Sequence, residues 1–296
     1  MTGKVPVGRA IADGYRFALR NFLSLLGLVW LPYLVLLLVS VGLAMLIAPD
    51  LPRIVATQDY DLPAAMRILR LVLLIAVLGF ITDSMIAVGV QTKALGLHPR
   101  PVWFYFSLGA PVWRMAGALF LAGIVIFVIA LLTSGVCTAI WFAAHALGGA
   151  ALLARVLDLC TGAAFIIYVA VRLLFFLPAV VVAEGRIGLE RGWVLGGHDF
   201  WRILIVAVAV ILPVAIVFHL LAWAVLGSAA GLRMGAVVSA REILRAAVLN
   251  YGAISPFALL FGLLERIVLL GVANGAIASA YLAVAGPTPG TAPPAA

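Results

Sequence analysis

Four ionisable residues interrupt long apolar runs of this chain, and they are its first candidates for chemistry: Asp83, Arg172, Glu265 and Arg266. A charge at the middle of a membrane-spanning helix costs about 2.5–3.5 kcal/mol unless it is paired or hydrated. Such residues therefore line a polar cavity or headgroup site, or they neutralise each other as pins between helices. We expect Asp83 to pair with Arg172 or with Arg266.

A second polar group occupies residues 185–202, where Glu190, His198 and Asp199 carry the groups of a metal or acid–base site. Their spacing is not that of a metal site, and the chain contains neither His-Glu-x-x-His nor paired Cys-x-x-Cys. An interfacial elbow that contacts lipid headgroups is the favoured interpretation. We predict no catalytic residues, no metal and no cofactor, and an intramembrane enzyme is the least supported class.

The elements that position these residues follow from composition. Apolar residues make up 66% of the 296 residues and charged residues only 10%, whereas a soluble domain carries roughly 25% charged residues. Six stretches are long enough to cross a hydrocarbon core of about 30 Å. They are residues 22–48, 68–95, 115–141, 152–183, 203–226 and 256–285.

The sequence therefore predicts an all-α polytopic membrane protein with about six transmembrane helices. Residues 1–285 form a single transmembrane domain, and residues 286–296 form a disordered tail rich in Pro and Ala. Between the fifth and sixth spans, charged residues interrupt apolar ones, which predicts a helix lying on the membrane surface. Those charged residues are Arg233, Arg241, Glu242 and Arg245.

Aromatic residues before alternate spans indicate an internal repeat. Tyr15, Tyr105 and Trp193 precede the first, third and fifth spans at intervals of 90 and 88 residues. A repeat of this length predicts units of one structural design. The units are about 9–96, 97–185 and 186–285, each an interfacial amphipathic elbow helix followed by a two-helix hairpin. Asp83 and Arg172, 89 residues apart, would lie at equivalent depths in successive units.

The first elbow has separate apolar and charged faces, typical of a helix lying in the membrane plane. The apolar face holds Ile11, Tyr15, Ala18, Leu19 and Phe22, and the charged face holds Arg9, Asp13, Arg16 and Arg20. The alternative is the flank of a simple signal anchor.

Two further sets of residues are candidates for contacts. Arginines and tryptophans beside the spans are expected to contact lipid headgroups at the interface: Arg20, Trp113, Arg114, Trp193, Trp201 and Arg202. Gly271, Gly275 and Ser279 form a ridge of small residues on the sixth span, which predicts a close helix–helix contact. The contact lies within the chain or between subunits of a homo-oligomer.

The charge of the chain favours lipid over nucleic acid. The net charge is +8, but the basic residues flank apolar spans, where each attracts anionic lipid with about 1 kcal/mol. No basic patch interleaves with aromatic residues on a soluble domain, which argues against nucleic-acid binding. With the N-terminus inside, the inner segments hold more basic residues than the outer ones, so both termini are predicted to be cytoplasmic.

One stretch resembles a known family. The run from Arg172 to Pro178-Ala, followed by Trp193 and Trp201-Arg202, is similar to the six-helix membrane domain attached to some bacterial glycerophosphodiester phosphodiesterases and to its stand-alone relatives. The phosphodiesterase barrel of those enzymes is missing here, so the resemblance implies a non-catalytic membrane module of a bacterial inner membrane.

The predicted function is therefore that of a non-enzymatic membrane protein, which organises anionic lipid headgroups or a membrane protein partner at the inner face of the plasma membrane. The alternative is a transporter or lipid translocase whose route is lined by Asp83, Arg172, Glu265 and Arg266. The two differ in whether these charges face each other or a water-filled cleft.

Overall fold

The computed structural model describes residues 4–47, 62–97, 103–146, 151–230 and 256–286, and these contain helices and no strands. The helices are α1 (Val7–Arg20), α2 (Phe22–Ile47), α4 (Leu62–Ala94), α5 (Ala110–Ala146), α6 (Ala151–Leu174), α7 (Leu177–Glu184), α8 (Leu189–His198), α9 (Phe200–Ala230) and α11 (Pro256–Ala285). Six stretches of helix are long and apolar enough to cross a membrane. The predicted surface helix after the fifth span falls largely on residues 231–255, outside the described residues, as does the tail from residue 287.

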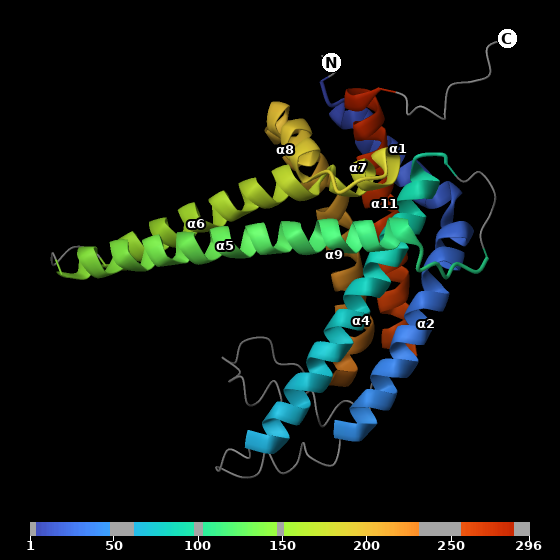
Figure 1. Cartoon of the computed structure of the whole chain (residues 1–296), viewed down its shortest axis with the longest axis horizontal. Coiled ribbons are helices and arrows are strands. Elements are labelled where there is room, and N and C mark those ends of the chain that lie inside the picture. Colours follow the sequence, from blue (N-terminus) through green and yellow to red (C-terminus); the bar gives the residue numbers. More distant parts are fainter. Residues whose placement is uncertain (1–3, 48–61, 98–102, 147–150, 231–255, 287–296) are drawn as a thin grey trace.

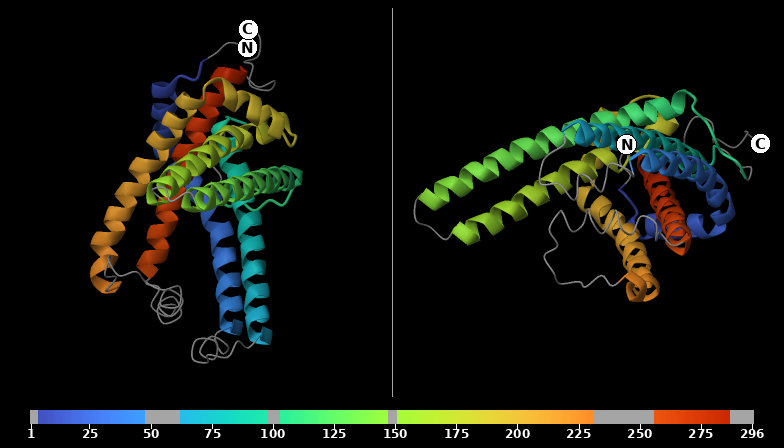
Figure 2. Two further views of the ribbon diagram at one scale, coloured as in Figure 1. Left: turned by 90° about the vertical axis from the view of Figure 1, so that its left-hand side faces the viewer. Right: turned by 90° about the horizontal axis from the view of Figure 1, so that it is seen from below.

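The six spans form three helix pairs: α2 with α4, α5 with α6, and α9 with α11. Four of these helices, α2, α4, α9 and α11, run from one end of the molecule to the other, whereas α5 and α6 run crosswise to them (Figure 1). Figure 2 shows the same arrangement from two further sides, with the N-terminal and C-terminal segments at one end of the molecule. The chain therefore consists of a four-helix body and a hairpin that projects from it.

The projecting hairpin is anchored only at its base. There, Met115 and Ala118 of α5 are completely buried against a cluster that includes Met85 of α4 and Leu177 of α7. Beyond Ala122 most of the α5 side chains are exposed, as an apolar helix facing lipid would leave them. The base of α5 is thus held by α4 and α7, and the base of α6 is held by α8 and α9.

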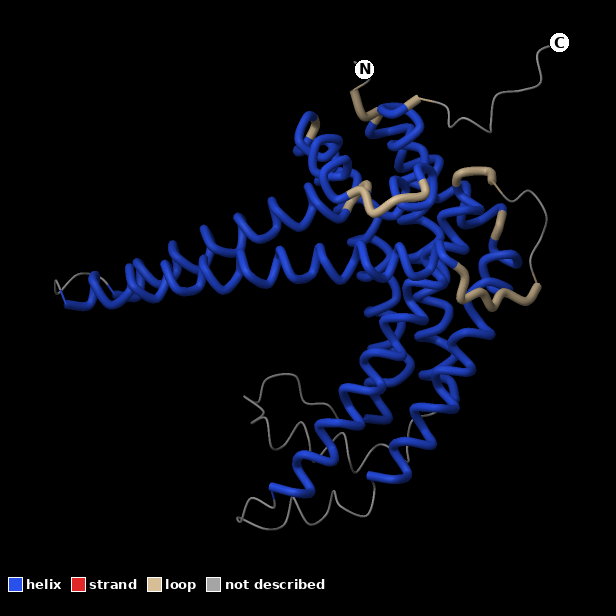
Figure 3. Tube along the Cα trace, viewed as in Figure 1, coloured by secondary structure: helices blue, strands red, loops and turns tan. Residues whose placement is uncertain are grey.

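The fourth predicted span is not one helix but two, α6 and α7 (Figure 3). The break falls at Phe175 and Phe176, immediately before α7, whose first turn contains Pro178. Proline has no N–H to donate and disfavours helical geometry in the residue before it, so one helix ends and the next begins here. Pro32 and Pro213, by contrast, lie inside α2 and α9 without ending them.

The interfacial elbows are not alike. The first is the helix α1 and the third is the helix α8, but residues 103–109 before α5 are not helical. The prediction of an elbow helix before every hairpin is therefore wrong for the second unit. Its polar and turn-favouring residues Ser107 and Gly109 explain the difference, since Ser107 hydrogen-bonds to the N–H of Gly109 in a local turn.

The predicted apolar face of α1 packs into the core except at Leu19, which is 79% exposed. Ile11, Tyr15 and Phe22 lie against the main core cluster. The buried residues of the helix are small ones, Ala10, Gly14 and Ala18. These small residues allow α1 to lie directly against α11, because a side chain any larger would hold the two backbones apart.

Candidate functional site

Asp83, Arg266 and Tyr33 form a polar cluster where α4, α11 and α2 meet. The Arg266 guanidinium donates to the Asp83 carboxylate at 2.5 Å, and the Tyr33 hydroxyl donates to the same oxygen at 3.2 Å. The guanidinium also lies over the Tyr33 ring, 4.7 Å from its centroid. Asp83 and Arg266, two of the predicted intramembrane charges, thus neutralise each other. Tyr33 is the third residue of this cluster, and it was not predicted because it carries no charge.

Arg172 belongs to a different site. Its guanidinium lies 4.1 Å from the centre of the Trp193 ring. It donates to the Tyr168 hydroxyl at 2.6 Å and to the Trp193 carbonyl oxygen at 3.3 Å. It does not pair with Asp83, and no carboxylate among the described residues forms an ion pair with it. Glu265 is likewise without an ion-pair partner in the described part of the chain.

Two glycines make room for Arg172. A Cβ atom on Gly196 would lie 2.3 Å from the Arg172 carbonyl oxygen, and one on Gly197 would lie 2.3 Å from its guanidinium. Because the atom near Gly196 belongs to the backbone, α8 can approach α6 this closely only where that position lacks a side chain. The glycine at 197 leaves the Arg172 guanidinium free to take its observed position. The local sequence is thus specialised to hold a guanidinium against Trp193.

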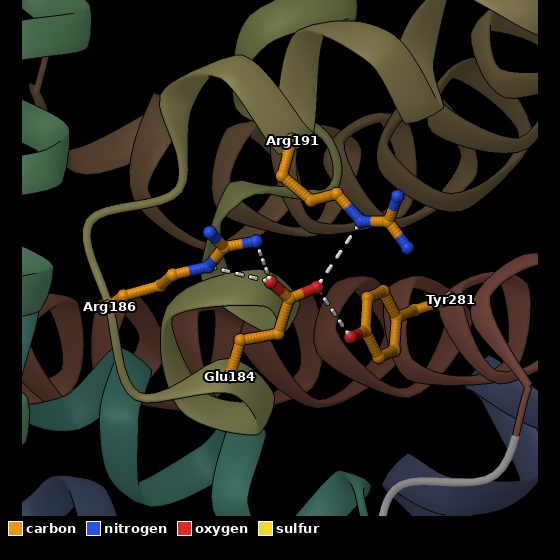
Figure 4. Close-up of polar contacts among 4 residues, drawn as sticks. All are labelled: Glu184, Arg186, Arg191 and Tyr281. Carbon is orange, nitrogen blue, oxygen red and sulfur yellow. Dashed lines mark hydrogen bonds and ion pairs between the residues drawn. The ribbon is translucent and has the colours of Figure 1, made fainter.

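A polar junction that the sequence search did not single out is centred on Glu184, the last residue of α7 (Figure 4). Its carboxylate accepts from Arg186 at 2.9 and 2.7 Å, from Arg191 at 3.3 Å, and from the Tyr281 hydroxyl at 3.3 Å. These contacts join α7, the segment after it, α8 and α11. The signal available in the sequence was Glu184-Gly185-Arg186, where Gly185 takes a positive φ of 65° and ends the helix.

We expect Glu184→Gln to lower the free energy of unfolding in detergent by about 1 kcal/mol, since one carboxylate serves two guanidiniums and a nearly buried phenol. Arg186 contributes little to this value because its side chain is 64% exposed. Glu190→Gln is the matched control, since Glu190 is exposed and forms no ion pair with the described residues. An equal loss in thermal unfolding for both variants would contradict a special role for Glu184.

In the third candidate group, Glu190 with His198 and Asp199, the His198 side chain lies outside the described part of the structure. Asp199 accepts from the backbone N–H of Val5 at 2.8 Å, and Arg202 donates to the Val5 carbonyl at 3.2 Å. Asp199 and Arg202 also contact each other at 3.8 Å. The elbow before α9 therefore binds the N-terminal segment of the chain itself. One of the Arg202 N–H groups that was expected to contact a lipid headgroup is used in this contact.

The remaining residues predicted to contact headgroups are distributed between surface and interior. Trp113 is 55% exposed and Trp201 is 71% exposed, and Arg20 and Arg114 are exposed as well. Trp193 is less exposed because its ring lies under Arg172. Arg20 is the last residue of α1, Trp113 and Arg114 lie near the start of α5, Trp193 lies on α8, and Trp201 lies in the first turn of α9.

The small-residue ridge of α11 packs within the chain. A Cβ atom on Gly275 would lie 2.8 Å from the Phe17 side chain, and one on Gly271 would lie 3.1 Å from the Cβ of Ala18. Ser279, the third member, donates to Asp13 at 2.8 Å. The partner surface is therefore α1, and the ridge is used inside the subunit.

No protein-family model, curated protein or solved structure matches the chain. The classification therefore rests on the fold, which defines an all-α, multi-pass integral membrane protein. Its described polar sites are an ion pair within the body, an arginine held by aromatic groups, and a basic junction near the termini.

Proposed function

We propose that this protein is a non-enzymatic membrane protein that binds anionic lipid headgroups at the end of the molecule carrying both termini. The observation that carries the proposal is Arg172, a guanidinium held by Trp193 and Tyr168 with no carboxylate partner among the described residues. A cation in this position needs an external anion, and a phosphate of a bilayer lipid is the anion most available there.

The charge distribution at the same end supports the proposal. Basic residues outnumber acidic ones among its described residues. The basic residues are Lys4, Arg9, Arg16, Arg20, Lys93, Arg114, Arg172, Arg186, Arg191 and Arg202, and the acidic residues are Asp13, Glu184, Glu190 and Asp199. Exposed Trp113 and Trp201 accompany them, and tryptophan favours the depth of lipid headgroups. By the same reasoning we infer that this end faces the cytoplasm. The resemblance described above implies that the membrane is a bacterial inner membrane.

Native mass spectrometry with added phosphatidylglycerol tests the proposal. We expect Arg172→Gln to reduce retention of this anionic lipid about tenfold, the value of one charge-assisted contact. Arg114→Gln is a second variant whose exposed side chain can be removed without disturbing the core, and it should reduce retention by a smaller factor. Arg70→Gln is the control, because Arg70 is exposed on α4 far from this end.

Equal retention by all three variants, or equal retention of phosphatidylcholine and phosphatidylglycerol, would refute headgroup selectivity. If instead a protein co-purifies in fixed stoichiometry and no lipid is selected, the basic end is a docking surface for that protein.

A lipid translocase is the second candidate, and one observation favours it. The Asp83–Arg266 pair is neutral as a whole, yet its two side chains are 46% and 44% exposed. A half-exposed ion pair inside a membrane-spanning helix can contact the polar headgroup of a lipid as it crosses the membrane. Transfer of a fluorescent phospholipid between leaflets of liposomes, faster with the protein and slowed by Asp83→Asn/Arg266→Gln, would establish this activity. An unchanged rate with and without protein would eliminate it.

A further inference from the structure

A groove lies between α2 and α11, beside the Asp83–Arg266 pair. Its volume is about 620 Å³, within the range of roughly 300–1,000 Å³ usual for small-molecule sites. Half of its lining residues are leucines, including Leu34 and Leu37 of α2 and Leu263 of α11, and Arg266 is its one charged lining residue in the described part of the chain. The shape and chemistry are those of a site for a hydrocarbon chain with one polar end.

Trp30, one of the lining residues, is held in place by other aromatic residues. The Trp30 indole N–H donates to the Trp103 carbonyl at 3.1 Å, and the Trp30 ring stands edge-on to Phe104 with centroids 5.6 Å apart. These contacts fix the Trp30 side chain at the rim, so the groove is a shaped surface and not merely a gap between two helices.

The charge in this groove lies deep within the helices. About 16 Å of helix separates Asp83 from the end of α4 at Ala94, and about 15 Å separates Arg266 from the start of α11 at Pro256, at ~1.5 Å per residue. A hydrocarbon core is about 30 Å thick, so the pair lies near its middle. Polar groups at that depth need hydrogen-bond partners, because lipid chains supply none.

Arg266 has more hydrogen-bond donors than Asp83 accepts from. A guanidinium carries five N–H groups in a planar fork, and Asp83 is its one hydrogen-bond acceptor among the described residues. Its side chain remains 44% exposed. One edge of the guanidinium therefore holds Asp83, while other N–H groups are available to a ligand in the groove.

We propose that the groove binds a long-chain fatty acid, with the carboxylate on Arg266 and the hydrocarbon chain along the leucines of α2 and α11. A planar carboxylate matches the guanidinium fork. A carboxylate on a single chain is also smaller than a phosphate with its glycerol and second chain, so it places less polar bulk at mid-depth. This site is separate from the headgroup site at Arg172 and does not depend on it.

Gly262 allows the groove to be blocked without disturbing the fold. It lines the groove, and a Cβ atom placed on it would meet nothing within 4 Å. Gly262→Leu therefore fills the space that the hydrocarbon chain would occupy. Gly123→Leu is the matched control, because Gly123 also has nothing within 4 Å but lies on α5, outside the groove.

The test is photolabelling of the full chain in phosphatidylcholine nanodiscs with a diazirine-bearing palmitic acid. We expect crosslinks in the segments 34–40 and 260–263 of the wild-type protein and of Gly123→Leu, reduced at least fivefold in Gly262→Leu. The alcohol with the same chain and diazirine should label these segments about tenfold less, because it lacks the charge that pairs with Arg266.

Several outcomes would overturn the fatty-acid site. Labelling spread evenly over exposed helices such as α5, labelling unchanged in Gly262→Leu, or equal labelling by the acid and the alcohol would each do so. Stronger labelling by a single-chain phosphate probe would also reject the carboxylate. Retention of phosphatidylglycerol by Gly262→Leu is expected to match the wild type, so failure here and failure at Arg172 give separate results.

Discussion

Asp83→Asn is expected to lower the apparent melting temperature of the detergent-solubilised protein by roughly 5–10 °C. The substitution leaves the Arg266 charge without its carboxylate in the interior of the spans, at a cost of about 2.5–3.5 kcal/mol. One kcal/mol corresponds to roughly 2–4 °C for a protein of this size class. The Arg266 contact with the Tyr33 ring survives the substitution, so the loss measures the missing carboxylate.

Two variants separate the ion pair from general disturbance of the helices. The double variant Asp83→Asn/Arg266→Gln removes both charges together, and we expect it to recover most of the lost stability, because two neutral amides leave no uncompensated charge. Glu265→Gln changes the neighbouring acid, which has no ion-pair partner among the described residues, so it should not lower the melting temperature. A melting temperature for Asp83→Asn equal to that of the wild type would show that the pair is not a stabilising contact.

Gly14→Val is expected to cause a large packing defect between α1 and α11. A Cβ atom at this position would lie 2.6 Å from the Val272 carbonyl oxygen and 3.0 Å from the Ala276 Cβ atom. Because the first of these atoms belongs to the backbone of α11, no side-chain rotation can relieve the clash. Overpacking usually costs about 1–3 kcal/mol, and we expect at least the upper end of that range.

The readout for this variant is both stability and the position of α1. If α1 is forced from α11, trypsin should cleave after Arg16 or Arg20 faster than in the wild-type protein, and the melting temperature should fall. Gly8→Val is the matched control, since Gly8 is in the same helix but has nothing within 4 Å of its Cβ position. Similar cleavage and melting for both variants would mean that the close contact of α1 with α11 is not needed for stability.

The same contact explains why α11 carries its small residues. Gly271, Gly275 and Ser279 were predicted to mark a helix interface, but a single sequence does not say whether the partner helix belongs to the same chain. The answer depends on where α1 lies, and α1 has its own small residues, Ala10, Gly14 and Ala18, spaced four residues apart. The small residues of α1 and of α11 face each other, and together they allow the close contact between the two helices.

Several parts of the architecture were determined by the sequence alone. Hydropathy is a local property that acts over a single helix, so the stretches 22–48 and 256–285 correspond closely to α2 and α11. The break before Pro178 was not predicted, since the stretch 152–183 was interpreted as one helix. The internal repeat placed the three helix pairs in order along the chain.

The tertiary structure decided which distant residues meet. Repeat spacing placed Asp83 and Arg172 at equivalent depths, but α6 belongs to the hairpin that runs crosswise to α4, and Asp83 therefore pairs with Arg266 of α11 (Figure 1). Likewise, Arg202 was expected to reach lipid and instead contacts the backbone of Val5. The physical reason is the same in both cases: burial of an apolar helix is satisfied by lipid or by any neighbour, so hydropathy does not specify partners, whereas each charged side chain must find a particular one.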